Sequence, residues 1–121
     1  MRIVDSSFIV EGLLKNKGLL EEDLLLTVDL ALYGAANSVW KHQYLLEDLD
    51  DGLPYLSIVY GLVESGRTRI VDAGAELVEK THSQSAKHRL PVHDTVYVAL
   101  ARELESPLGA FDKRQARLMN S

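Results

Sequence analysis

The chain opens with Met1-Arg2-Ile3-Val4-Asp5-Ser6-Ser7, an apolar β-branched run that ends in an acid and two hydroxyls. Ile3 and Val4 favour an extended backbone, and an unalternating apolar run is typical of a central parallel strand buried on both faces. Such a strand would present Asp5 at its carboxyl end, where open α/β sheets bind their ligands. A second interpretation is that Asp5, Ser6 or Ser7 caps the helix that follows.

Three further apolar runs, at residues 24–26, 68–71 and 107–111, predict strands in the same way. Between the strands, apolar residues recur at helical spacing. Helices are expected over residues 8–18, 27–46, 54–66, 75–88 and 94–104 and in a short last segment, with Thr27 as a cap and Gly18 and Gly66 as stops. The alternation of strands and helices is typical of a single α/β domain.

The bulk composition is that of an ordinary globular chain. The 121 residues include 46% hydrophobic and 26% charged side chains, which is enough for one domain spanning residues 1–121. No apolar run approaches the roughly 20 residues of a membrane span, and no leader pattern precedes the first strand. The lack of cysteine excludes disulfides and thiolate metal sites. We therefore expect a cytoplasmic protein that does not contact membranes.

The net charge of −5 argues against a general affinity for nucleic acid. An acidic chain that handles phosphates needs either a local basic rim or divalent cations that bridge its carboxylates to the substrate. The acidic turn at residues 47–52 is interpreted as a solvated loop, because it lacks the spacing of a calcium-binding hand.

Three acids occupy equivalent places in the predicted fold. Asp5 and Asp112 end predicted strands, and Asp94 begins a predicted helix. In a parallel sheet all three can face one cleft, where their mutual repulsion favours a bound cation. Mg²⁺ or Mn²⁺ suits such oxygen ligands, and either ion can orient a phosphodiester and activate a water. The alternative is an unrelated α/β domain in which these aspartates only cap helices.

Polar residues near these acids fit the same chemistry. Ser6 or Ser7 can hydrogen-bond a ligand carboxylate or the scissile phosphate. Lys113 and Arg114 place positive charge beside Asp112, where an RNA backbone needs it. The remaining puzzle is Gly34, inside the longest predicted helix, where glycine costs about 1 kcal/mol relative to alanine.

Four segments together resemble the PIN domain of VapC-type toxins, over nearly the whole chain. They are Val4-Asp5-Ser6-Ser7, Leu30-Ala31-Leu32-Tyr33 with Asn37 and Trp40, the run from His93 to Ala101, and Phe111-Asp112-Lys113-Arg114. The resemblance implies a three-layer α/β/α sandwich with a central parallel sheet of four to five strands. It also implies a metal-dependent endoribonuclease that hydrolyses RNA through a metal-activated water, forms a homodimer and is inhibited by a small antitoxin.

The resemblance assigns roles to individual residues. Asp5, Asp94 and Asp112 match the family's catalytic, metal-binding acids. Four further residues are expected to support these acids or bind substrate: Ser6, Asn37, Lys113 and Arg114.

One family position is not matched. The remaining family acid is a glutamate in the second long helix, and Gly34 stands at that position. Asp29 begins the same helix and would reach the cleft only with a different local backbone. The alternative function is therefore a catalytically weakened PIN fold that acts as an RNA- or protein-binding regulatory module.

Overall fold

Four short parallel strands form one sheet in the order β3-β2-β1-β4. The computed structural model describes residues 1–111 and 113–119. The strands are β1 (Arg2–Val4), β2 (Leu25–Val28), β3 (Thr68–Val71) and β4 (Leu108–Gly109). All three strand pairings are parallel, so the carboxyl ends of the strands lie at one edge of the sheet. The four predicted strands are confirmed, with the last of them shorter than expected.

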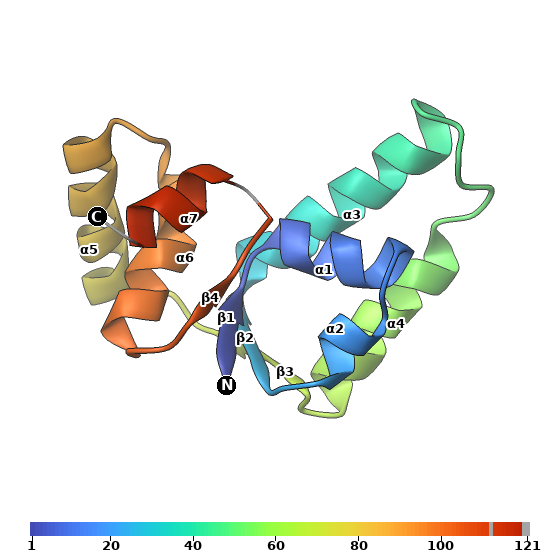
Figure 1. Ribbon diagram of the computed structural model, residues 1–121, viewed down its shortest axis with the longest axis horizontal. Coiled ribbons are helices and arrows are strands. Elements are labelled where there is room, and N and C mark those ends of the chain that lie inside the picture. Colours follow the sequence, from blue (N-terminus) through green and yellow to red (C-terminus); the bar gives the residue numbers. More distant parts are fainter. Residues whose placement is uncertain (112, 120–121) are drawn as a thin grey trace.

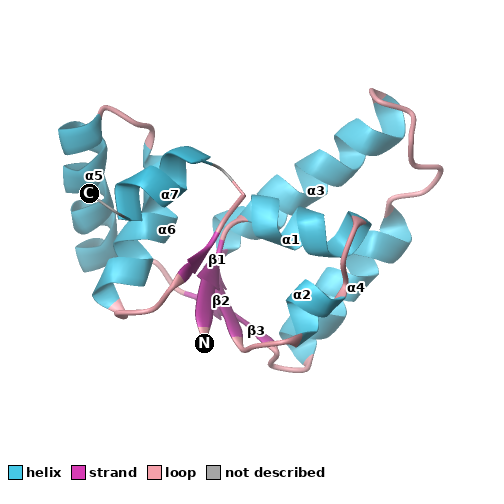
Figure 2. Cartoon of the chain, in the orientation of Figure 1, coloured by secondary structure: helices cyan, strands magenta, loops and turns pink. Residues whose placement is uncertain are grey.

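Helices cover both faces of this sheet. They are α1 (Ser6–Leu14), α2 (Gly18–Glu21), α3 (Asp29–Tyr44), α4 (Leu53–Glu64), α5 (Ala75–His88), α6 (Val92–Glu103) and α7 (Lys113–Met119). Figure 1 shows α5, α6 and α7 on one side of the strands and α1 to α4 on the other. Figure 2 shows the strands as a thin layer between these two groups of helices. The three-layer α/β/α prediction is therefore confirmed.

Strand β1 lies between β2 and β4 and carries the centre of the core. Its Ile3 and Val4 side chains are completely buried, as the unalternating apolar run predicts. They belong to a continuous apolar cluster with residues of α1, α3 and α6, including Phe8, Ala35 and Leu100. This central position fixes where the backbone delivers Asp5.

The predicted cap at Thr27 is wrong. Thr27 lies in β2, and its buried hydroxyl donates a hydrogen bond to the Val4 carbonyl oxygen at 2.6 Å. Pairing of β2 with the whole of β3 extends the strand through Val28, so α3 begins only at Asp29. The ladder with a neighbouring strand outweighs the local capping preference of threonine.

The predicted helix over residues 8–18 is also wrong at both ends. Helix α1 ends at Leu14, and Gly18 begins the short helix α2 instead of ending the first one. The Asn16 side chain accepts a hydrogen bond from the Gly18 amide at 3.1 Å, which starts the new turn. Within the described ranges, no helix is long and apolar enough to cross a bilayer.

Candidate functional site

A cavity of about 230 Å³ lies at the carboxyl end of β1. We call it the acid pocket. Side chains or backbone from the start of α1, from α3, from α6 and from α7 line it, namely Asp5, Ser6, Ser7, Leu30, Gly34, His93, Asp94, Tyr97 and Gln115. The pocket therefore unites segments from both ends of the chain, and it contains two of the three acids singled out in the sequence.

Asp5 is both a helix cap and a wall of the acid pocket. Its side chain is 3% exposed, and Oδ1 accepts hydrogen bonds from the Ser7 hydroxyl at 2.6 Å and the Phe8 amide at 2.9 Å. The second of these is the N-cap bond of α1. The two interpretations of Asp5 that the sequence allowed are thus compatible, because capping engages Oδ1 while the residue still lines the cavity.

The Ser7 hydroxyl connects Asp5 to the opposite end of the chain. While it donates to Asp5, it accepts a hydrogen bond from the Phe111 amide at 3.1 Å. Phe111 follows β4, and the centroid of its ring lies 5.9 Å from the centroid of the Phe8 ring. Ser7 therefore orients the Asp5 carboxylate and holds the connection between β4 and α7 against it.

Asp94 reaches the acid pocket from the first turn of α6. A carboxylate there is favoured by the partial positive charge of the helix N-terminus. Its side chain is mostly buried, and Oδ1 lies 3.7 Å from Nε2 of the exposed His93. The sequence predicted Asp94 as the first residue of this helix, whereas α6 begins two residues earlier at Val92.

Tyr97 is buried in the acid pocket one turn after Asp94. Burial raises the pKa of its phenol above the usual value of 10, and the negative charges of Asp5 and Asp94 raise that pKa further. The hydroxyl therefore stays protonated at neutral pH and can donate a hydrogen bond. Sequence reasoning assigned Tyr97 no role, since a tyrosine at this helical spacing is typical of a core residue.

Gly34 brings α3 into direct contact with α1. A Cβ atom at this position would lie 2.7 Å from Cβ and 2.8 Å from Oγ of Ser6, closer than van der Waals contact allows. Ser6 therefore occupies the space that the Cβ atom of a glutamate at position 34 would need. Close packing of two helices, and not helix propensity, explains the glycine.

Gln115 is a pocket residue that sequence reasoning missed. It lies on α7, its side chain is 4% exposed, and it lines the acid pocket with Asp5 and Asp94. Its Oε1 is buried and has no hydrogen-bond partner among residues 1–111 and 113–119. Nothing in the local sequence marks it, because its burial depends on how α7 packs against α6.

The other predicted site residues lie elsewhere or outside the described part. Asn37 is exposed on α3 and does not line the acid pocket, and Asp29 lines an adjoining apolar cavity that shares Leu30 and His93 with it. Asp112 lies outside the described residues. Lys113 and Arg114 begin α7, but their side chains are outside the description as well.

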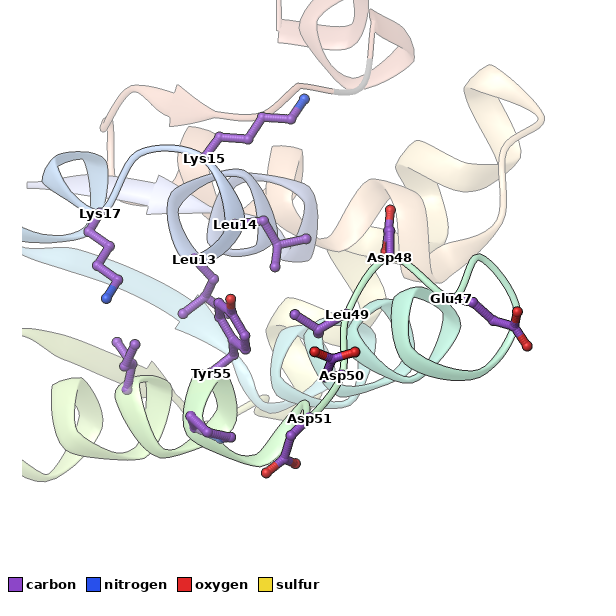
Figure 3. A pocket seen from close by; sticks show the side chains of 12 residues that line it. Leu13, Leu14, Lys15, Lys17, Glu47, Asp48, Leu49, Asp50, Asp51 and Tyr55 are labelled. Carbon is purple, nitrogen blue, oxygen red and sulfur yellow. The ribbon is translucent and has the colours of Figure 1, made fainter.

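A larger cavity, of about 770 Å³, lies at the other end of α1. Figure 3 shows lysines from the α1–α2 region on one side of it and the acidic loop before α4 on the other. Helix α1 has nine residues and so keeps this cavity about 13 Å from Asp5. Among residues 1–111 and 113–119, no three histidine, aspartate or glutamate side chains gather to hold a metal ion. We therefore place the candidate site at the acid pocket, where two of the three predicted acids, Asp5 and Asp94, lie.

Comparison with known proteins identifies the family. No family model matches the chain. A curated protein, Ribonuclease VapC3 of Pyrobaculum aerophilum, is 32% identical over 92 residues, which cover 74% of this chain and 67% of the relative. The aligned length and the parallel three-layer fold agree with the four resembling segments of the sequence. The chain belongs to the VapC-type PIN-domain family.

Proposed function

We propose that this chain is a metal-dependent endoribonuclease of the toxin–antitoxin type, with its active site at the acid pocket. The observation that carries the proposal is that Asp5 and Asp94, from the end of β1 and the start of α6, line one cavity. The similarity to a protein named a ribonuclease supports RNA as the substrate.

The donor atoms of the acid pocket fit a hard divalent cation. Two mostly buried carboxylates line it, together with Gln115, whose buried Oε1 has no hydrogen-bond partner in the part of the chain that the structure describes. Such oxygen ligands suit Mg²⁺ or Mn²⁺ and not softer metals. By sequence Asp112 supplies a third carboxylate. A divalent cation held there would polarise the scissile phosphate and lower the pKa of a bound water.

The chain's own residues would prepare the site for this chemistry. The Ser7 hydroxyl and the Phe8 amide fix the orientation of the Asp5 carboxylate. The Tyr97 phenol, which is protonated at neutral pH, can donate a hydrogen bond to a phosphate oxygen. By sequence, Lys113 and Arg114 follow Asp112 and are the candidates to hold the RNA backbone.

The proposal predicts that Asp94→Asn reduces RNA cleavage in Mn²⁺ by at least about 100-fold, because even residues that only orient metal ligands account for 10- to 100-fold effects. The measurement is the rate at which the purified chain cuts a labelled RNA, with and without Mn²⁺. Asp50→Asn makes the same chemical change in the exposed loop before α4 and serves as the matched control. Undiminished cleavage by Asp94→Asn would refute the proposal.

The second candidate function is an RNA- or protein-binding regulatory module with weakened catalysis. It is favoured by the contact between Gly34 and Ser6, because that contact leaves no room for the family glutamate. In the same assay this function predicts an RNA complex in a gel-shift experiment and no cleavage product. Cleavage that depends on Mn²⁺ and Asp94 would exclude it.

A further inference from the structure

The side chain of Gln115 presents an energetic problem that the fold alone does not solve. It is almost completely buried, yet its Oε1 has no hydrogen-bond partner within the described residues. Buried amide oxygens in folded proteins nearly always have a partner, and one without a partner destabilises the fold. An apolar side chain of similar size would fill the same space without this cost.

The position of Gln115 indicates what the missing partner is. The residue lines the acid pocket together with Asp5 and Asp94, so its side chain belongs to a wall that also carries two carboxylates. These three residues share one property, namely a side-chain oxygen that can bind a hard cation. In the described ranges, one other buried side-chain polar atom has no partner, His88 Nε2 at the end of α5, and His88 does not line this pocket.

The position of the family glutamate, on α3, supplies no carboxylate to the pocket. Gly34 contributes no side chain, and Ser6 fills the space next to it. The pocket therefore has one carboxylate fewer than the resemblance implies, and Gln115 adds an oxygen from a different element, α7.

We infer that Gln115 is a metal ligand of the acid pocket and that its Oε1 replaces the glutamate carboxylate missing at Gly34. The inference rests on the proposed function, since it assumes a divalent cation between Asp5 and Asp94. A neutral amide in place of a carboxylate leaves the pocket with less negative charge. The metal-free chain therefore suffers less repulsion, at the expense of weaker cation binding.

The experiment is a calorimetric titration of Mn²⁺ into the full chain and its variants, together with the melting temperature of each metal-free protein. Gln115→Leu keeps the volume and removes the oxygen. We expect it to bind Mn²⁺ at least tenfold more weakly and to melt, without metal, at the same temperature as the parent or higher. Arg117→Ala, an exposed change on the same helix, should alter neither quantity.

Gln115→Glu tests the inference in the opposite direction. A third carboxylate should tighten Mn²⁺ binding at least tenfold and lower the metal-free melting temperature, because like charges then meet in a buried site. Addition of Mn²⁺ should restore the melting temperature. This variant decides the matter if Gln115→Leu does not fold.

Asp94→Asn in the same titration separates the two proposals. If it abolishes Mn²⁺ binding while both Gln115 variants bind like the parent, Gln115 is not a ligand and the proposed function stands. If the parent itself binds no Mn²⁺, both the metal site and the role of Gln115 are refuted.

Discussion

Asp5 shows how a single residue can serve the fold and the site at once. Its Oδ1 caps α1 through the Phe8 amide, and the same carboxylate forms a wall of the acid pocket. Asparagine is as good an N-cap as aspartate, so Asp5→Asn removes the charge and spares the cap. Asp5→Ala would remove both, so only the asparagine variant isolates the effect on the pocket.

Replacement of Gly34 by alanine should destabilise the protein, although alanine has the higher helix propensity. In an open helix, Gly34→Ala would stabilise the protein by about 1 kcal/mol. Here the new Cβ would lie 2.7 Å from Ser6 Cβ, so α1 and α3 must move apart. We expect the free energy of unfolding, measured by urea denaturation, to fall by about 1–3 kcal/mol, which is the usual cost of overpacking.

Ser6→Gly provides the control for this prediction. In the Ser6→Gly background, Gly34→Ala should lose most of its cost, because the two side chains no longer collide. A single Gly34→Ala variant as stable as the parent would show that the helices separate easily. The family glutamate could then be restored without further change.

At the scale of elements, local sequence decided most of the fold. The strand at residues 68–71 and the helix at 75–88 have the predicted bounds, because apolar spacing and neighbouring glycines agree there. Thr27 and Gly18 were assigned wrongly because their positions depend on other segments: a strand ladder for Thr27, and a second short helix for Gly18. Propensity is outweighed where tertiary contacts compete with it.

The site residues also divide into those that the local sequence marks and those that depend on contacts between distant segments. Asp5 and Asp94 stand out in the sequence because each lies at a predicted element boundary. Tyr97 and Gln115 do not, because their roles depend on contacts made only when distant elements meet. The sequence indicated that Ser7 could donate to a ligand carboxylate, as it does to Asp5, but not that it accepts from a distant backbone amide. The hydrogen bond between Ser7 and Phe111, for example, joins positions 104 residues apart.

Through that hydrogen bond, Ser7 links α1 to the segment that connects β4 with α7. Ser7→Ala removes a donor to Asp5 and an acceptor for the Phe111 amide. We expect Mn²⁺ binding to weaken by about 10- to 100-fold, as for other residues that orient metal ligands. Calorimetric titration measures this, and Ser7→Thr, which keeps the hydroxyl, should recover most of the affinity.

Ser6→Ala is the matched comparison for Ser7→Ala. Among the described residues, the Ser6 hydroxyl makes no hydrogen bond to Asp5. Ser6→Ala should therefore weaken Mn²⁺ binding less than Ser7→Ala does. Equal losses of Mn²⁺ affinity in the two alanine variants would show that the hydrogen bonds of Ser7 to Asp5 and Phe111 have no special role.

At the scale of the whole molecule, the outer surface of α3 and α4 suggests self-association. Trp40, Tyr44 and Leu53 are exposed and line a shared groove of about 320 Å³. Exposed apolar surface of this kind often marks an interface. We propose that it contributes to a homodimer and that an antitoxin is the other protein partner of this chain.

The homodimer predicts twice the monomer mass in sedimentation or light scattering. Tyr44→Lys should shift the equilibrium toward monomer without unfolding the chain, because the side chain is 61% exposed and a buried lysine at an interface is costly. Leu104→Lys, at the exposed residue that follows α6, should leave the mass unchanged. A parent chain that sediments as a monomer would refute the dimer.

The sheet order has a consequence for how the protein is made. Strand β1 is translated early and β4 late, yet they are neighbours, and the acid pocket is lined by both Asp5 and Gln115. A nascent chain on the ribosome has no β4 beside β1 and no α7 over the pocket until its last segments emerge. The proposed active site therefore forms only after the segment through residue 115 has emerged from the ribosome.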